Sequence, residues 1–425
     1  MRTVDLLVLN AAEVVTVATG PAGPARGRVA MNDLGVMHDA SVAIHRGRIV
    51  AVGPTNSITK AYRGTKRVFA EGCALLPGFV DAHTHPVFAK WRDDEFARRC
   101  RGEAYEAILA AGGGILVSAK AVEETDEAEL RAGLESRLDE VLLHGTTTME
   151  AKSGYGLSVE AELKSLRAIR AAARASTVRL VATFLGAHAI PAAYAKRRAA
   201  YVSLVTDEMI PAVAKQRLAA FCDVFCETGA FTKAESARIL RAAKAAGLAT
   251  KIHADEFGDG GGAALAAREG ATSAEHLGGT GPAGIRALVK AGVVPVLLPT
   301  TSLFLRLAGR PDARAMIEAG CAVALASDFN PGSSPTGNLQ LTAALGCSML
   351  GMTPEEAITA ITRNAAAAVG LSGRVGSLAR GFAADLVILD APSYVHVPYR
   401  LGTNLVRTVV ATGQVVVEDG RLVGR

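Results

Sequence analysis

A strand-and-helix pattern that recurs between residues 74 and 330 constrains the fold of this 425-residue chain more than any other feature. Each unit is a short, β-rich apolar run that ends in polar residues, followed by an Ala/Leu/Glu/Lys/Arg-rich stretch typical of a helix. The eight runs are ALLPGFVDAHTH, GTTTMEAKSGYG, VRLVATFLGAHA, FCDVFCETGAF, LATKIHADEF, ATSAEHL, VVPVLLP and CAVALASDFN. Alternating strands and helices predict a parallel sheet, and eight units favour a closed (β/α)8 TIM barrel over an open doubly wound sheet.

The two ends of the chain lack this pattern and instead contain short strands separated by turns. Residues 1–73 include SVAIHRGRIVAVGP, and residues 371–425 include GFAADLVILD and VRTVVATGQVVVEDGRLVGR. Because each segment is small for a free-standing domain, we expect the two to pair into one β-sandwich. The predicted fold is therefore α/β, with a barrel over residues 74–370 and a small β-sandwich built from the N- and C-terminal segments.

Two stretches of the barrel segment carry clear helix boundaries. One begins at Thr232 and ends at Gly247, an N-cap residue and a glycine stop. The other opens with TPEEAI, where Thr353 and Glu356 have the spacing of a capping box, and we expect it to end at Gly370.

Composition excludes several classes of protein. Half of the residues are hydrophobic and 20% are charged, which indicates a sizeable core. The net charge of +5 is spread along the chain without a dense basic block, so no nucleic-acid partner is expected. Six scattered cysteines without a C-x-x-C motif suit buried thiols in a reducing compartment. The N-terminus does not resemble a signal peptide and no apolar run could span a membrane, so we expect a cytoplasmic protein without a membrane partner.

Polar residues gather where the predicted strands end, which is where barrel enzymes place their reactive groups. Five of the nine histidines fall at these ends. Scattered core histidines would not collect in this way. The residues concerned are His83, His85, Lys152, Tyr155, His188, Glu227, His253, Asp255, Glu256, His276 and Asp328.

The motif DAHTHP places three polar side chains on one face of the first barrel strand, because successive side chains in a strand point to opposite faces. These are Asp81, His83 and His85. An H-x-H pair alone is as typical of surface or hydrogen-bonded histidines as of a metal site. Together with His253 and Asp328 from other strand ends, however, it predicts a site for one zinc or ferrous ion that leaves room for a water molecule.

Further residues at the strand ends are candidates for supporting roles. Glu256 lies three residues after His253 and could take a proton from the water and pass it to a leaving nitrogen, although it could also be a solvated acid or an N-cap. His276 could stabilise an oxyanion, although a lone histidine is more often a core residue. We expect Asp81 and Asp255 to orient a histidine ligand, and GDGGG from Gly258 to be a flexible turn into a helix.

With these residues assembled, the chain closely resembles the imidazolonepropionases, within the metal-dependent amidohydrolase superfamily. The likeness covers essentially the whole chain. HTH indicates only the superfamily, whereas KSGYGL and SDFNPGSSP are more specific. The motifs that carry the resemblance are HTHPVFA (83–89), KSGYGL (152–157), FLGAHAIP (184–191), HADEF (253–257) and SDFNPGSSP (327–335).

The resemblance implies hydrolysis of 4-imidazolone-5-propanoate to N-formimidoyl-L-glutamate in histidine degradation by a metal-activated water. It implies one Zn2+ or Fe ion per subunit, a small-molecule substrate with a carboxylate tail, and a homodimer. The implied metal ligands are His83, His85, His253 and Asp328, and the implied catalytic residues are Glu256, His276 and Asp328. The implied substrate contacts are Arg92 with the propionate, Tyr155 and His188 in the pocket, Glu256 with the ring, and the loop residues Asn330, Gly332 and Ser333.

The sequence departs from the family pattern beside the site. Glu275 precedes His276 where aspartate is expected, and Lys90 and Trp91 precede Arg92 where smaller or polar residues are usual. The fourth strand, FCDVFCETG, lacks the lysine that bridges two metals in hydantoinase-like relatives, which favours one metal. One alternative is another mononuclear amidohydrolase, such as a heterocyclic-base deaminase, but a deaminase needs no grip for a propionate. The other alternative is a non-catalytic metal-binding relative, but no ligand or acid/base residue is missing.

Overall fold

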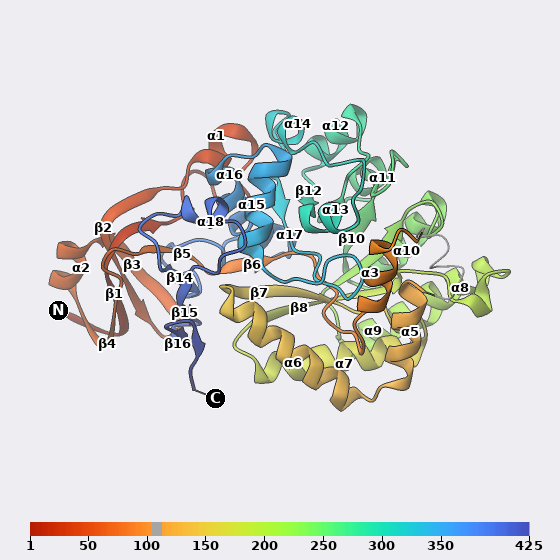
Figure 1. Ribbon diagram of the computed structural model, residues 1–425, viewed down its shortest axis with the longest axis horizontal. Helices are drawn as coiled ribbons and strands as arrows, with labels where there is room; N and C mark the ends of the chain where they lie inside the picture. The colour runs from red at the N-terminus through yellow and green to blue at the C-terminus, as the bar shows by residue number, and fades with distance from the viewer. Residues whose placement is uncertain (104–112, 425) are drawn as a thin grey trace.

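The computed structural model describes residues 1–103 and 113–424. A barrel surrounded by helices lies beside a sheet that contains both ends of the chain (Figure 1). Among the described residues, no helix combines the length and the apolar character that crossing a bilayer requires.

The barrel consists of eight strands that pair in parallel in chain order from β6 to β13. A parallel bridge between Thr84 and Phe329 brings the first and last strands together. Each of the eight runs identified in the sequence contributes one strand to the barrel, so the predicted barrel is confirmed. The strands are β6 (Phe79–Asp81), β7 (Thr146–Lys152), β8 (Arg179–Ala187), β9 (Phe221–Cys226), β10 (Ala249–Ala254), β11 (Ser273–His276), β12 (Val294–Leu297) and β13 (Ala324–Leu325).

The first of these runs is divided, which corrects its prediction as one barrel strand. Its first residues form β5 (Ala74–Pro77), which pairs with strands of the terminal sheet, and the barrel strand begins only at Phe79. Gly78 joins β5 to β6, where the chain passes from the terminal sheet to the barrel. A Cβ at this position would lie 2.2 Å from the hydroxyl of Thr147. Only glycine can pass so close to the neighbouring barrel strand.

The terminal sheet joins strands from both ends of the chain, as predicted. β5 pairs in parallel with β1 and antiparallel with β14, so it links the N-terminal and C-terminal halves. One apolar cluster contains Val8 and Ile44 from the first half and Leu386 and Val410 from the second, which gives the sheet its own core. Its other strands are β1 (Arg2–Val15), β2 (Val36–His45), β3 (Arg48–Pro54), β4 (Tyr62–Phe69), β14 (Leu386–Leu389), β15 (Val406–Ala411), β16 (Gln414–Glu418) and β17 (Arg421–Leu422).

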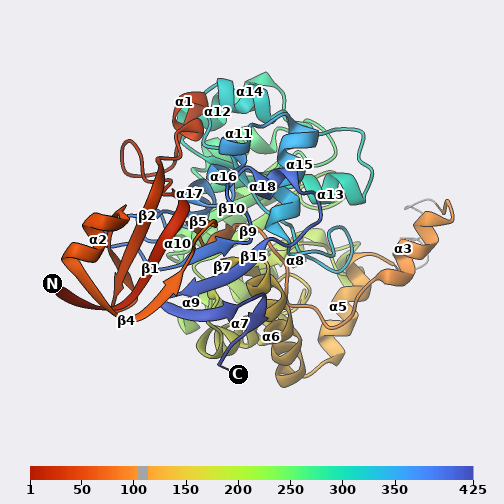
Figure 2. The ribbon, with the colours of Figure 1, turned by 60° about the vertical axis from the view of Figure 1, so that its left-hand side comes forward.

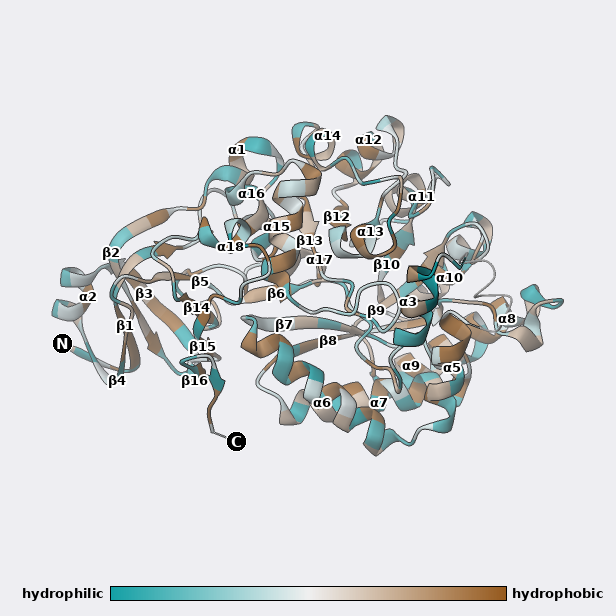
Figure 3. Ribbon diagram, in the orientation of Figure 1, coloured by the Kyte–Doolittle hydropathy of each residue, from teal (hydrophilic) through white to brown (hydrophobic). Residues whose placement is uncertain are grey.

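Most of the helices cover the outside of the barrel, whereas α2 (Thr55–Ala61) packs against strands of the terminal sheet. In α6 (Glu127–Leu143), Leu130, Leu134 and Leu138 recur every four residues and are buried, while the polar residues between them give the helix its mixed colouring in Figure 3. Helices α3 and α5 project from the barrel on the side away from the terminal sheet (Figure 2). The remaining helices are α1 (Gly27–Asn32), α2 (Thr55–Ala61), α3 (Asp93–Cys100), α5 (Ile115–Glu124), α7 (Val159–Ala175), α8 (Arg198–Ser203), α9 (Ile210–Gln216), α10 (Lys233–Ala245), α11 (Gly262–Arg268), α12 (Pro282–Ala291), α13 (Pro299–Phe304), α14 (Ala313–Glu318), α15 (Leu339–Leu350), α16 (Pro354–Ala360), α17 (Arg363–Ala368) and α18 (His396–Tyr399), with short 3-10 and π segments at Ala192–Tyr194 and Leu204–Met209.

Both predicted capping sites are present, but one helix ends early. Thr232 and Thr353 each form a capping box at the start of α10 and α16. The helix that begins after Thr353 stops at Ala360, and a separate α17 follows. The carbonyl of Ile361 accepts a hydrogen bond from the backbone N–H of Val80 in the barrel, and Thr362 adopts φ −128° and ψ −93°, outside the helical region. The interruption therefore joins this helical segment to β6.

Candidate metal centre and active site

Closure of the barrel brings three of the four predicted metal ligands together. The backbone N–H of Asp328 donates to the carbonyl of His83 at 3.0 Å, and the N–H of His85 donates to the carbonyl of Phe329 at 2.9 Å. These bonds fix the chain after β6 against the chain after β13. His253 extends from β10, and all four predicted ligands are buried.

Donor atoms of the predicted ligands lie close enough together to share one ion, and one ring nitrogen each from His83, His85 and His253 lie within 4.8 Å of one another. The Nε2 atom of His85 lies 3.3 Å from Nε2 of both His83 and His253. Oδ1 of Asp328 lies 3.5 Å from Nε2 of His83 and 3.4 Å from Nε2 of His85. Tetrahedral bonds of about 2.0–2.1 Å place neighbouring ligand atoms about 3.3–3.4 Å apart. The residues present therefore fit a single metal ion.

The electrostatics of these ligands also suit a cation. Burial holds the pKa of His83 and His85 well below the usual range, so both rings are neutral and can donate a lone pair. Burial raises the pKa of Asp328 to about 6. The hydroxyl of Thr301 donates to Oδ2 of Asp328 at 2.6 Å and leaves Oδ1 facing the histidines.

Two aspartates expected to orient a histidine ring have other partners, so that expectation is wrong for the described structure. Asp81 accepts hydrogen bonds from the backbone N–H and the hydroxyl of Ser327 at 3.0 and 2.5 Å. Asp255 accepts from the backbone of Gly260, Gly262 and Ala263 and from a threonine hydroxyl. The GDGGG segment is therefore a turn held by a buried carboxylate.

Glu256 and His276 lie beside the predicted ligands. Oε1 of Glu256 is 3.6 Å from Nδ1 of His276. The carboxylate of Glu227 accepts from the backbone N–H groups of Glu256 and Phe257, which fixes the start of the segment. Burial, followed by the charges of Asp328 and Glu227, raises the pKa of Glu256 well above its ordinary value. A carboxyl group that readily holds a proton suits general acid catalysis.

One cavity of about 140 Å3 brings the predicted substrate-contact residues together with the metal-ligand group. Of the predicted site residues, all but His83, which lies deeper, line this cavity. Additional lining residues, including Phe225, Phe257 and Leu305, supply apolar walls. The predicted residues in the lining are His85, Arg92, Tyr155, His188, His253, Glu256, His276, Asp328, Asn330, Gly332 and Ser333.

Arg92 presents a guanidinium with free hydrogen-bonding capacity to this cavity. Its Nε and Nη1 atoms are buried and make no hydrogen bond within the described residues, and its nearest carboxylate, that of Glu95, lies 3.8 Å from Nε. A Cβ on Gly332 would lie 1.2 Å from Nη2 of Arg92. Gly332 thus provides the space for the guanidinium, which suits a bidentate carboxylate ligand.

The loop from Asn330 to Ser333 is held mainly by one side chain. Oδ1 of Asn330 accepts from the backbone N–H groups of Gly332 and Ser333, both at 2.8 Å. Its Nδ2 donates to the carbonyl of Asp328 and to the hydroxyl of Ser333. Asn330 therefore shapes the loop beside Arg92, a contribution distinct from direct contact with a ligand.

Glu162 organises the KSGYGL loop and was not identified from the sequence. Its buried carboxylate accepts backbone hydrogen bonds from Gly154, Gly156 and Leu157. The carbonyl of Gly154 in turn contacts Nδ1 of His188 at 3.0 Å. In sequence, Glu162 resembles an ordinary acid in the first turn of α7, so no local signal pointed to this role.

Trp91, an unusual residue before Arg92, remains 40% exposed and contacts aromatic residues at the barrel rim. Its ring centroid lies 4.7 Å from that of Phe88 and 6.0 Å from that of Phe329, and the guanidinium of Arg137 lies 3.4 Å from the Phe88 ring. The departure from the family pattern therefore adds packing behind Arg92 and leaves the guanidinium at the cavity.

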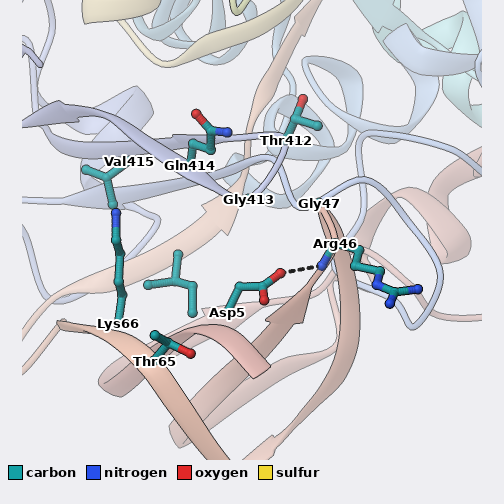
Figure 4. A pocket seen from close by; sticks show the side chains of 10 residues that line it. Asp5, Arg46, Gly47, Thr65, Lys66, Thr412, Gly413, Gln414 and Val415 are labelled. Carbon is teal, nitrogen blue, oxygen red and sulfur yellow. Dashed lines mark hydrogen bonds between the residues drawn. The ribbon is translucent and has the colours of Figure 1, made fainter. Parts of the chain in front are cut away.

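A larger hollow of about 740 Å3 lies in the terminal sheet (Figure 4). Its charged side chains, Asp5, Arg46 and Lys66, are exposed, and Asp5 accepts from the backbone N–H of Arg46. Without convergent buried polar groups, it does not have the character of an active site.

Comparison with known proteins defines the class. Residues 89–417 match the model of the amidohydrolase family. An adenosine deaminase from Xanthomonas campestris solved with bound zinc superimposes with a TM-score of 0.75 at 20% identity, covering 100% of this chain and 95% of that one. The guanine deaminase of E. coli gives a TM-score of 0.75 at 15% identity, covering 97% and 98%. The chain is thus an amidohydrolase, and these structural likenesses show its fold.

Closer relatives narrow the assignment. The imidazolonepropionase of Symbiobacterium thermophilum is 49% identical over 99% of both chains. That of Geobacillus kaustophilus is 47% identical over 98% of this chain and 99% of its own, and that of Chloroflexus aggregans 46% identical over 99% and 100%. The chain belongs to the imidazolonepropionase family.

Proposed function

We propose that this chain hydrolyses 4-imidazolone-5-propanoate to N-formimidoyl-L-glutamate, a step of histidine degradation. The observation that carries the proposal is the buried guanidinium of Arg92, which faces the same small cavity as the metal-ligand group. A substrate with a carboxylate at one end and a cyclic amide at the other would satisfy both ends of that cavity. Membership of the imidazolonepropionase family supports the same reaction.

His83, His85, His253 and Asp328 would hold one metal ion. A bound metal supplies Lewis acidity, which lowers the pKa of a water molecule and polarises a carbonyl group. Imidazole and carboxylate donors suit both zinc and ferrous iron, so we propose one Zn2+ or Fe ion per subunit.

The other residues divide the remaining work. Arg92 binds the propionate, and Tyr155 and His188 line the pocket around the imidazolone ring. Glu256 contacts the ring and removes a proton as the water oxygen attacks the ring carbonyl carbon. It then delivers that proton to the ring nitrogen as the carbon–nitrogen bond breaks.

Two residues assist these steps. His276, beside Glu256, donates to the developing oxyanion. Asp328, whose Oδ2 is bonded to Thr301, shares the proton transfer while its Oδ1 serves as a ligand. The loop of Asn330, Gly332 and Ser333 holds the substrate or product around Arg92.

The alternatives identified from the sequence explain fewer of these features. A heterocyclic-base deaminase would have no use for a guanidinium in its pocket whose buried Nε and Nη1 atoms make no hydrogen bond within the described residues. A non-catalytic metal-binding relative would not need Glu256, which lines the cavity with a raised pKa. We further propose that the protein acts as a homodimer in the cytoplasm. Its six free cysteines suit a reducing compartment.

The experiment that tests the proposal follows 4-imidazolone-5-propanoate by its ultraviolet absorbance in the presence of purified protein. Bound zinc and iron are measured in the same sample, and the product is identified by mass. We expect metal-dependent loss of absorbance and formation of N-formimidoyl-L-glutamate. Metal-loaded protein that leaves the substrate intact would refute the proposal. Light scattering after size exclusion tests the dimer.

A further inference from the structure

Five charged side chains lie inside the barrel beneath the proposed metal centre, and the proposed reaction uses none of them. We call them the interior ion cluster: Glu150 and Lys152 on β7, Asp223 on β9, Lys251 on β10 and Glu275 on β11. Each is fully buried. Charges without access to water must be paired, and such a cluster is costly unless its geometry is well satisfied.

Two ammonium groups bridge the three carboxylates. Nζ of Lys152 lies 2.7 Å from Oδ2 of Asp223 and 2.8 Å from Oε2 of Glu150. Nζ of Lys251 lies 2.8 Å from Oε1 of Glu150 and 3.6 Å from Oε1 of Glu275. The carboxylates are thereby fixed in position.

One member of the cluster contacts a proposed metal ligand. Oδ2 of Asp223, the oxygen bonded to Lys152, lies 3.0 Å from Nδ1 of His253. The opposite ring nitrogen, Nε2, faces His85 at 3.3 Å on the metal side. A neutral imidazole has one proton, so a ring that ligates through Nε2 must have its proton on Nδ1, where it can donate to a carboxylate.

The cluster could instead be a second metal site. Donor atoms of His83, Asp223, His253 and Glu275 all lie within 4.8 Å of one another. However, the ammonium of Lys152 is already 2.7 Å from Asp223, and that of Lys251 approaches Glu275. These resident cations would repel a divalent ion, so the geometry favours a support for one metal over a second site.

We propose that Asp223, held by Lys152, is a positioning residue for the metal ligand His253. It keeps the proton on Nδ1 and fixes the ring so that Nε2 points at the metal. This inference rests on the proposed metal centre. Asp223 contacts neither substrate nor metal in this arrangement, and its effect is exerted through His253.

The test measures metal affinity, which does not depend on turnover. Apo protein is titrated with Co2+ in competition with a chromophoric chelator, and the visible spectrum of bound Co2+ reports the ligand geometry. We expect Asp223→Asn to bind Co2+ about 10- to 100-fold more weakly than wild type with a changed spectrum. Thr183→Val is the matched control, because Thr183 is equally buried and donates to Glu150 of the same cluster at 2.5 Å. It should retain wild-type affinity.

The outcomes separate the two levels of the proposal. If wild type binds no Co2+, or binds it equally well after His253→Ala, the metal centre itself is wrong. If wild type and His253→Ala behave as proposed but Asp223→Asn binds within twofold of wild type, only the positioning role is wrong. An equal loss in Thr183→Val would assign the effect to general loosening of the core. If Asp223→Asn does not fold, Asp223→Glu, which keeps the charge but displaces the carboxylate, should show the same weakened binding, and normal binding would refute the role.

Discussion

Gly332→Ala tests whether the position of one guanidinium sets substrate affinity. In the structure, the added Cβ would lie 1.2 Å from Nη2, 2.0 Å from Cζ and 2.3 Å from Nε of Arg92. Normal contact between heavy atoms requires about 3.5 Å. The guanidinium must therefore move by about 2 Å, unless the loop from Asn330 moves instead, and that loop is held by the side-chain bonds of Asn330.

The expected increase in KM follows from the hydrogen bond between Arg92 and the propionate that such a shift removes. A hydrogen bond to a charged group contributes about 1.5–3 kcal/mol. Loss of one of the two bonds in an Arg92–propionate fork would raise KM by about 10- to 150-fold. The proposed acid/base residue Glu256 is not displaced by this change, so kcat should fall much less than KM rises.

Steady-state kinetics with 4-imidazolone-5-propanoate, alongside Arg92→Ala, measure this effect. Gly258→Ala is the control, because a Cβ at Gly258 meets no atom within 4 Å. Its kinetics should match wild type. An unchanged KM in Gly332→Ala would show that the substrate carboxylate is held elsewhere. A KM increase in Arg92→Ala alone would show that the loop adapts to the added methyl group.

Four further outcomes are expected. Glu256→Gln should retain metal and lose about 10^2- to 10^4-fold in kcat, and near-normal turnover would exclude it as the acid/base. Removal of metal with a chelator should abolish activity, zinc or iron should restore it, and His253→Ala should not respond to added metal. Glu162→Gln should lower the free energy of unfolding by about 1–3 kcal/mol and raise KM, since the carboxylate holds the loop of Tyr155; unaltered urea denaturation would count against this. Burial lowers the pKa of His144 below 6.5. As the pH falls below about 6.5, the unfolded state binds a proton on this side chain more readily than the folded state does, so the free energy of unfolding decreases. His144→Gln should reduce this decrease when unfolding is measured from about pH 7.5 to about pH 5.5.

The convergence of His83, His253 and Asp328 could be predicted because barrel topology places strand ends at one rim. Asp328 follows the eighth strand and His83 the first, and closure makes these neighbours, as the hydrogen bond between their backbones shows. The fold could be predicted from the sequence for the same reason. The spacing of hydrophobic residues and the polar residues at strand ends are both local signals, and both agree with the barrel topology.

Features that depend on tertiary contacts were not predictable. The helix after Thr353 continues in sequence but stops because Val80 takes the carbonyl of Ile361. Similarly, Asp255 lies two residues after the proposed metal ligand His253, and its position in the sequence suggested that it supports that ligand. Its carboxylate oxygens instead accept hydrogen bonds from backbone N–H groups in the turn at Gly260–Ala263. Propensity and spacing do not specify which of several available donors a carboxylate will meet.

The interior ion cluster shows what a sequence signal for such contacts could be. Glu150 and Lys152 are two residues apart on one buried strand, and Lys251 and His253 have the same spacing on another. In a closed barrel, alternate residues of each strand point inward, so charges with this period must meet charges from neighbouring strands. Pairing of Lys152 with Asp223 and of Lys251 with Glu150 follows from that requirement, because both ammonium groups are fully buried. Alternating charged residues within an apolar barrel strand therefore predict a layer of ion pairs beneath the proposed active site. Burying these charges costs free energy, and a role in holding His253 would offset that cost.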